Sequence, residues 1–201
     1  MTFSMLIGLL IILPVIGAIA ILITGKKENL RESMSFIAAF SVFGVVLKLL
    51  NSTQFDGQKL DLFTFFPGVS FSFFYDPFSL VFGFVASFLW IVTTMYSIGY
   101  MRGAKEINQT RYYICFALAI SATMGVAFAA NLLTLYIFYE LLSVSTYALV
   151  GHHQDKDAKY GARKYLIYLF GGSIALVLPA MIFIYQTMGT LDFTYTGIIP
   201  E

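Results

Sequence analysis

Residues Phe3–Thr24 read FSMLIGLLIILPVIGAIAILIT, a run without a single charged side chain. A helix needs about 20 mostly apolar residues to cross the hydrocarbon core of a bilayer, so this run predicts a transmembrane helix. Of the 201 residues, 59% are hydrophobic and only 11% are charged, whereas soluble domains carry roughly 25% charged residues. So little charge cannot cover an aqueous exterior, and we expect an integral membrane protein. Because the run lacks a basic leader and is long enough to span, we do not expect a cleaved signal peptide.

Further apolar runs of similar length follow, and the sequence predicts an all-α membrane protein of about six transmembrane helices. Glycines close four of the runs, as residues at helix ends do. The remaining predicted spans are Met34–Leu50, Pro77–Met101, Tyr112–Ala130, Leu132–Val150 and Tyr165–Met188, and the closing glycines are Gly25, Gly103, Gly151 and Gly189.

One segment between the second and third spans does not have a helical pattern. Leu60–Tyr75 reads LDLFTFFPGVSFSFFY, which alternates and is rich in aromatic residues on both sides of Pro67 and Gly68. This pattern predicts a short two-stranded hairpin with a Pro-Gly turn. Asp76 follows, with Pro77 after it, so we expect Asp76 to be the structural cap of the third helix.

The basic residues predict the orientation. Ten of the twelve Lys and Arg residues flank the first, third and fifth loops, which face the same side of a six-helix protein. The positive-inside rule then puts these loops in the cytoplasm, and the hairpin and both termini outside. The ten are Lys26, Lys27, Arg31, Arg102, Lys105, Arg111, Lys156, Lys159, Arg163 and Lys164. With no internal repeat or linker, we predict a single membrane domain over residues 1–201.

Several kinds of function are excluded by composition. A net charge of +1 without a basic cluster argues against nucleic-acid binding. The single cysteine, Cys115, and two adjacent histidines provide no framework for a metal or cofactor, and we expect none. No nucleophile–base pair is present, so we expect no catalytic site or redox centre in this chain. Any redox chemistry would belong to another subunit.

Glu140 is the candidate for chemistry, because it is the one acid predicted to lie in the middle of a span. A carboxylate at bilayer depth costs about 2.5–3.5 kcal/mol on insertion scales, so such residues are candidates for function. Tyr136, Ser143 and Tyr147 follow helical spacing on the same face and could hydrogen-bond the carboxyl group or hold water beside it. The alternative is a protonated glutamate that only ties helices together.

Three further residues on the cytoplasmic side are candidates. Lys164 is predicted to begin the sixth helix and could take part in ion translocation, although it could also be a lysine that snorkels to the interface. His152 and His153 lie at the cytoplasmic mouth of the fifth helix, where they could admit protons or be ordinary interfacial residues. Adjacent side chains point in different directions, so the histidines are not a metal-ligand pair.

Four segments together resemble the antiporter-like membrane subunits of Mrp-type cation/proton antiporters, membrane-bound hydrogenases and respiratory complex I. The resemblance covers nearly the whole chain and corresponds to the amino-terminal part of those subunits. The segments are FYDPFSLVF at Phe74–Phe82, TMYSIGYM at Thr94–Met101, NLLTLYIFYELLSVSTYALVG at Asn131–Gly151 and AKYGARKYLIYLFGGSIAL at Ala158–Leu176.

The resemblance implies a proton- or cation-translocating subunit in a multi-subunit complex, either an antiporter or a translocating oxidoreductase, in the plasma membrane of a prokaryote. Glu140 matches the family's fifth-helix glutamate, which pairs with a lysine on a broken seventh helix. Lys164 matches a lysine at the start of the sixth helix, and Asp76 an aspartate where the third helix opens. A structural or assembly subunit without its own ion path is the alternative.

The sequence also departs from the family pattern. Family members have about fourteen helices in two inverted repeats, whereas this sequence stops after the predicted sixth helix. We therefore expect a second membrane subunit to supply the remaining helices and the partner lysine, which would make this chain half of a split module. A truncated chain is the competing explanation.

Overall fold

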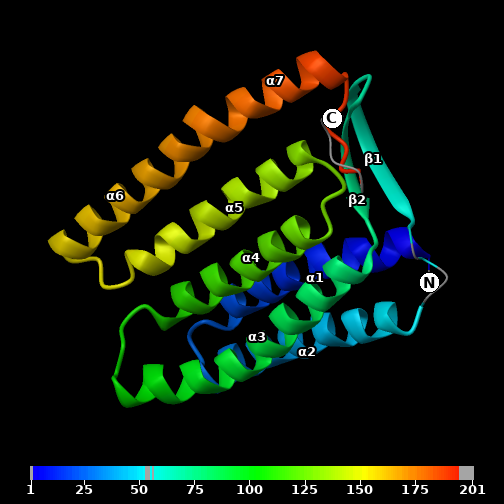
Figure 1. The fold of residues 1–201 in the computed structure, drawn as a ribbon. Coiled ribbons are helices and arrows are strands. Elements are labelled where there is room, and N and C mark those ends of the chain that lie inside the picture. The colour runs from blue at the N-terminus through cyan, green and yellow to red at the C-terminus, as the bar shows by residue number, and fades with distance from the viewer. Residues whose placement is uncertain (1, 53–54, 56, 195–201) are drawn as a thin grey trace.

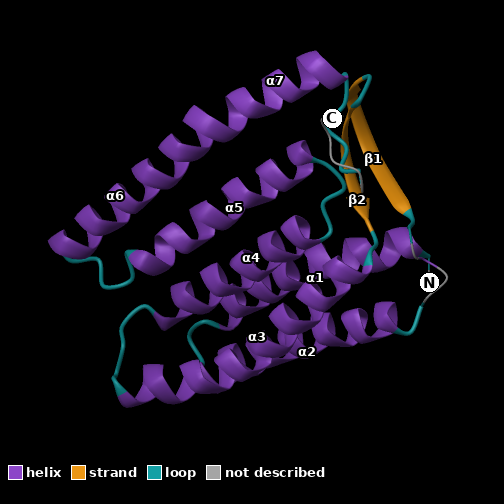
Figure 2. Ribbon diagram, viewed as in Figure 1, coloured by secondary structure: helices purple, strands orange, loops and turns teal. Residues whose placement is uncertain are grey.

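In the part of the chain that the structure describes, six helices able to span a membrane form the body of the molecule (Figures 1 and 2). The structure is a computed structural model that describes residues 2–52, 55 and 57–194. The helices are α1 (Phe3–Thr24), α2 (Glu28–Leu50), α3 (Pro77–Gly103), α4 (Gln109–Ala127) and α5 (Leu132–Val150), followed by a sixth span made of α6 (Lys156–Gly172), a π-helical segment η2 (Ser173–Val177) and α7 (Leu178–Met188). The predicted helical membrane fold is confirmed, and each described span is long and apolar enough to cross a bilayer by itself.

Three helices begin earlier than their apolar runs: α2 and the sixth span by several residues, and α4 by three, at Gln109 rather than Tyr112. α2 starts at Glu28 rather than Met34, and the sixth span starts at Lys156 rather than Tyr165. Hydropathy marks only the part of a helix that lipid surrounds, whereas a polar first turn continues past it. In α6 this turn is capped by Asp155, whose side chain accepts a hydrogen bond from the Ala158 amide at 2.6 Å. α4 ends at Ala127, three residues before the predicted end at Ala130.

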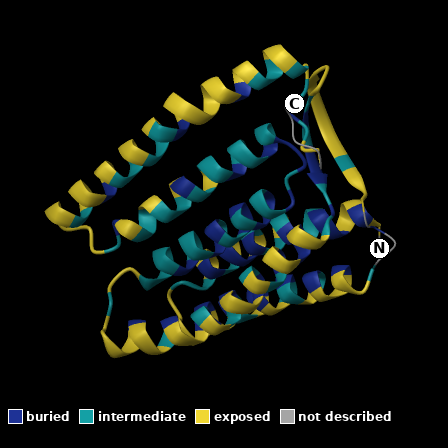
Figure 3. Cartoon of the chain, viewed as in Figure 1, coloured by how far each residue is buried: buried dark blue, intermediate teal, exposed yellow. Residues whose placement is uncertain are grey.

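The buried core lies among α1, α2, α3 and α4, which form the lower part of the view in Figure 1. Leu10, Val42, Trp90 and Met124, one from each of these helices, are at most 1% exposed. The surfaces of α6 and α7, in contrast, are largely exposed (Figure 3). Exposed apolar side chains on α1, α2, α3, α5 and the sixth span are what a lipid-facing exterior requires, whereas α4 has no exposed residue.

The predicted hairpin is confirmed. Strand β1 (Lys59–Phe66) pairs antiparallel with β2 (Val69–Phe74), and Pro67 and Gly68 form the turn between them. Gly68 has a φ of 79°, and a Cβ there would collide with the carbonyl of Gly189, so only glycine fits.

The hairpin is tied to the ends of the spans by main-chain hydrogen bonds. The Phe74 amide donates to the Phe128 oxygen at 2.8 Å, and the Ala130 amide donates to the Ser72 oxygen at 3.0 Å. After α7, the Leu191 amide donates to the Gly68 oxygen at 3.1 Å. The hairpin therefore joins the loop between α4 and α5 to the segment that follows α7.

The two sides of the molecule differ in charge. The hairpin, the start of α1 and the end of α7 lie on one side, called here the hairpin side (Figure 1). The loops 25–27, 104–108 and 151–155 lie on the other, the basic side. This arrangement agrees with six spans and with the predicted grouping of the basic residues.

Candidate ion-translocation site

Glu140 lies on α5, two turns after a firmly fixed helix start. The Asn131 side chain caps α5 by accepting a hydrogen bond from the Thr134 amide at 2.8 Å. Both carboxylate oxygens of Glu140 are buried, and within the described residues neither has a hydrogen-bond partner of normal geometry. Buried polar groups are nearly always paired, so this carboxyl group is an exception that requires an explanation.

Two polar side chains link Glu140 to its surroundings, one from α5 itself and one from the sixth span. The Tyr136 hydroxyl interacts with both Glu140 and Ser173, although its approach to the carboxylate falls short of a normal hydrogen bond. Ser173 is buried and opens the π-helical segment, where its hydroxyl donates to the Phe170 oxygen at 3.1 Å. The carboxyl group of Glu140 therefore lies near the point where α5 meets the break in the sixth span.

The break in the sixth span has a local cause. Pro179 is the second residue of α7 and has no N–H to donate to the Ala175 carbonyl four residues earlier. The backbone accommodates this with the wider turns of the π-helical segment Ser173–Val177. Such segments are rare and occur frequently at functional sites.

The other two side chains predicted to share a face with Glu140 do not reach its carboxyl group. The Ser143 hydroxyl donates to the Tyr139 oxygen of its own helix at 3.0 Å. Tyr147 is 37% exposed and lines a cavity on the basic side. The structure thus brings Tyr136 and Ser173 close to Glu140, and leaves Ser143 and Tyr147 further along the helix.

Lys164 does not begin the sixth helix, because α6 starts eight residues earlier, at Lys156. Its side chain is exposed, and its ammonium group lies 4.5 Å from the centre of the Tyr160 ring. This is a cation–π contact on the surface of α6, and the structure shows no contact between Lys164 and Glu140.

The two histidines share one acidic neighbour. His152 Nε2 lies 3.8 Å, and His153 Nδ1 3.7 Å, from Glu106 Oε2 in the loop between α3 and α4. Burial, together with the positive charge of Arg111, lowers the pKa of His152 below its ordinary value of 6.5, and the Glu106 carboxylate only partly opposes this. His153 is exposed. The pair lies at the basic side, as predicted.

Sequence reasoning missed one ionic cluster on the basic side. The sequence pattern assigns Arg31 to the first loop, but α2 includes both Arg31 and Glu32, and both are at most 5% exposed. The Glu32 carboxylate lies 3.5 Å from Arg31 and also accepts hydrogen bonds from Arg102 of α3. The available signal was the adjacent, opposite charges just before the second apolar run.

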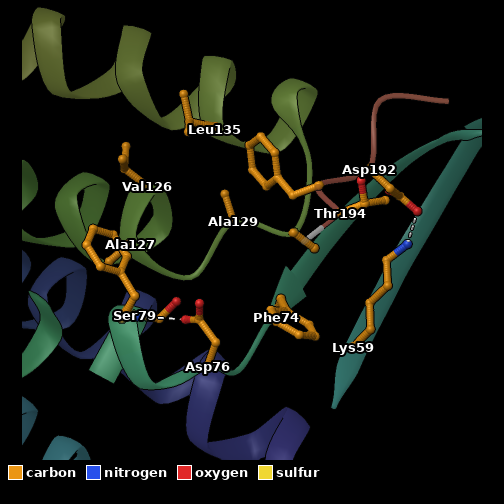
Figure 4. Close-up of a pocket in the computed structure, with 13 residues that line it drawn as sticks. Lys59, Phe74, Asp76, Ser79, Val126, Ala127, Ala129, Leu135, Asp192 and Thr194 are labelled. Atoms are coloured by element: carbon orange, nitrogen blue, oxygen red, sulfur yellow. Dashed lines mark hydrogen bonds and ion pairs between the residues drawn. The ribbon is translucent and has the colours of Figure 1, made fainter. Parts of the chain in front are cut away.

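A cavity of about 380 Å³ opens on the hairpin side (Figure 4). Asp76 lines it, and its carboxylate accepts a hydrogen bond from the Ser79 amide at 2.7 Å, as expected for the cap of α3. Lys59 reaches across to Asp192 at 2.5 Å. Burial alone would lower the pKa of Lys59, but its bonds and attraction to Asp192 and Asp61 outweigh this and raise it. Glu140 does not line this cavity.

Comparison with known families agrees with this geometry. The family described as NADH:quinone oxidoreductase/Mrp antiporter, transmembrane, matches residues 129–199, which include α5, the π-helical segment and α7. The family described as the N-terminus of chain 5 of NADH-ubiquinone oxidoreductase (complex I) matches residues 67–113. The fold and both matches define a multi-pass membrane protein of the antiporter and respiratory-complex type. The chain belongs to the antiporter-like membrane subunit family and corresponds to its amino-terminal part.

Individual relatives support the same assignment. The chain is 28% identical over 195 residues to Na(+)/H(+) antiporter subunit A1 of Staphylococcus aureus, covering 91% of this chain and 24% of the relative. It is 30% identical over 208 residues to NADH-quinone oxidoreductase subunit M of Rickettsia typhi, covering 98% of this chain and 41% of the relative. The chain thus spans less than half the length of these relatives.

Two solved structures share the fold. A chain of the Mrp complex from Dietzia sp. DQ12-45-1b superposes with a TM-score of 0.75 at 19% identity, over 96% of this chain and 36% of that one. A chain of the membrane-bound sulfane sulfur reductase, an archaeal respiratory membrane complex, gives a TM-score of 0.74 at 19% identity, over 92% and 38%. At this identity the likeness establishes the arrangement of helices.

Proposed function

We propose that this chain is part of a proton- or cation-translocating module in a multi-subunit complex of a prokaryotic plasma membrane, with Glu140 as its intramembrane relay acid. The observation that carries the proposal is the buried carboxyl group, which makes no normal hydrogen bond within the described residues. An unpaired acid in a span destabilises the fold. Function accounts for its presence, because a carboxyl group held in this way can gain and lose a proton as nearby charge changes.

The names of the relatives favour protons and sodium as the transported ions. One is a Na(+)/H(+) antiporter subunit and another an NADH-quinone oxidoreductase subunit. We therefore propose that protons, or protons exchanged for sodium, pass Glu140. Tyr136 and Ser173 would hold water beside it and carry the proton over short distances.

Glu140 also needs a cationic partner in this proposal. The partner lysine implied by the family resemblance would come from a helix beyond the six described, either on a continuation of the polypeptide or on another membrane subunit, as in the split module expected from the sequence. When the cation approaches, the carboxylate is stabilised and releases its proton. When the cation moves away, the carboxyl group takes up a proton again.

Substitution of Glu140 tests the proposal against the alternative of a purely structural subunit. We expect Glu140→Ala and Glu140→Gln to abolish sodium- or substrate-driven proton movement in everted membrane vesicles, while blue native electrophoresis shows normal assembly. Glu28→Gln removes the same charge from the first turn of α2 and should leave transport unchanged. Full transport by an assembled Glu140→Gln complex would favour the structural role, since an amide can still donate and accept hydrogen bonds.

A further inference from the structure

A second cavity, of about 360 Å³, lies on the basic side among α4, α5 and α6. Three cationic side chains line it: Arg111 from α4, and Lys159 and Arg163 from α6. Its polar lining includes Gln154 and Tyr147, and no acidic side chain of the described residues takes part. The cavity therefore concentrates positive charge in a concave space.

The helices place these cations around the cavity for simple geometric reasons. Lys159 and Arg163 are four residues apart, so they share one face of α6. Ala162 lies between them, is 1% exposed and meets Gly151 so closely that a Cβ at Gly151 would be 3.2 Å from the Ala162 Cβ. The backbones of α5 and α6 approach each other there, and the longer cationic side chains surround the space beside the contact.

The charge in this cavity is not neutralised from within. Arg111 Nη2 donates to the main-chain oxygens of Gly151 and His152, but its Nε is buried and has no partner among the described residues. Within the part of the chain that the structure describes, Arg111, Lys159 and Arg163 form no ion pair with an acid. Three like charges facing one cavity repel each other, and a bound anion would offset that cost.

We propose that this cavity binds a phosphate-bearing anion, the headgroup of an anionic phospholipid or free phosphate. The cavity lies where membrane helices end on the basic side, at the level of lipid headgroups, and basic pockets between helices on that side suit such headgroups. Exposed apolar residues of α6, such as Ile167, continue from it toward the membrane interior and provide a surface for an acyl chain. The proposal does not depend on the role of Glu140.

The test compares two double variants that lose the same charge on the same side. Lys159→Gln with Arg163→Gln removes two of the lining cations, whereas Lys26→Gln with Lys27→Gln removes two exposed cations of the first loop. The full-length protein in its complex is delipidated in mild detergent and titrated with phosphatidylglycerol or phosphatidylcholine, and binding is followed by native mass spectrometry. Sodium phosphate, matched in ionic strength with sodium chloride, is then added as a competitor.

We expect phosphatidylglycerol to bind in preference to phosphatidylcholine. The cavity variant should bind phosphatidylglycerol about thirtyfold more weakly, because each lost cation weakens the affinity roughly fivefold. The first-loop variant should bind it as tightly as wild type does. Failure of phosphate to displace the lipid beyond the chloride control would identify the ligand as a lipid headgroup. Displacement specific to phosphate would show that free phosphate uses the same site. Equal binding of phosphatidylglycerol by the two double variants would overturn the proposal.

Discussion

The guanidinium group of Arg102, near the end of α3, donates two hydrogen bonds to the buried carboxylate of Glu32, from Nε at 2.9 Å and from Nη2 at 2.5 Å. Arg31 lies 3.5 Å from the same carboxylate and donates to Gln109 at the start of α4. One acid therefore connects the basic-side ends of three helices. A two-point arginine–carboxylate contact fixes orientation as well as distance.

Glu32→Ala is expected to destabilise the protein by about 3 kcal/mol, because it removes the carboxylate next to the buried, positively charged Arg31. The thermal midpoint in detergent should fall by several degrees. Glu28→Ala, one turn earlier at an exposed position, should change it little. Equal midpoints for the two variants would show that the cluster contributes nothing to stability.

Asn131 is expected to be the most sensitive polar residue at the hairpin side. Its side chain caps α5 and donates to the Ser70 oxygen and the Ser72 hydroxyl, both at 2.7 Å. Asn131→Ala should cost about 2–4 kcal/mol, since it removes a cap and leaves buried acceptors unpaired. Asn131→Asp keeps the cap but loses the donors, so its thermal midpoint should lie between those of wild type and alanine. A midpoint equal to that of wild type would argue against the donor contacts.

Asp76 is expected to act through helix capping. Asp76→Ala should lower stability by about 1 kcal/mol, and Asp76→Ser should recover most of that, because serine also caps helix starts. Transport per assembled complex should stay close to wild type in both variants. Loss of transport in a stably assembled Asp76→Ser complex would instead place Asp76 in the ion path.

His152 gives stability a dependence on pH. Its pKa is lowered in the folded protein, so between the folded value and 6.5 the unfolded chain binds more protons. Stability therefore falls as the pH drops below about 6.5. We expect His152→Gln to flatten this part of the curve of thermal midpoint against pH, and His153→Gln, at the exposed neighbour, to change it less. Identical curves for wild type and His152→Gln would contradict the assignment.

Tyr136 is expected to assist Glu140. Tyr136→Phe removes the hydroxyl that interacts with Glu140 and Ser173 and that we propose holds water in the path, so it should slow transport about tenfold, the effect of one hydrogen bond to that water. Tyr139→Phe removes a hydroxyl from the same helix but from a different face, and serves as the matched control. Rates of ion movement in vesicles, normalised to assembled complex, separate the two. Equal rates would remove Tyr136 from the proposed path.

The helical spans and the hairpin could be predicted because each depends on local patterns. An uncharged run such as Phe3–Thr24 is stable in lipid only as a helix. The alternating pattern on both sides of Pro67 and Gly68 is typical of a hairpin. Helix starts were harder to predict: the polar turn beginning at Lys156 belongs to α6 although its composition resembles a loop. Hydropathy does not register a helix that continues beyond the membrane.

In the candidate site, too, the features set by local sequence could be predicted and those set by packing between helices could not. The depth of Glu140 and its face on α5 follow from position and helical spacing. The approach of Ser173 does not, because it depends on how the sixth span packs and on the π-helical segment that Pro179 introduces. The cluster of Arg31, Glu32 and Arg102 was missed for a similar reason, since α2 and α3 meet only in the folded protein.

The hairpin has a mechanical consequence. Its main-chain bonds hold the hairpin-side ends of α5 and α7 in one β-layer, whereas the basic-side ends of α5 and α6 are joined by the short loop 151–155. The sixth span is therefore attached to α5 at both ends, by the hairpin layer on one side and by the Gly151–Ala162 contact on the other. Arg111, Lys159 and Arg163 lie beside the second attachment, so the proposed anion would brace the two helices against each other at the membrane surface.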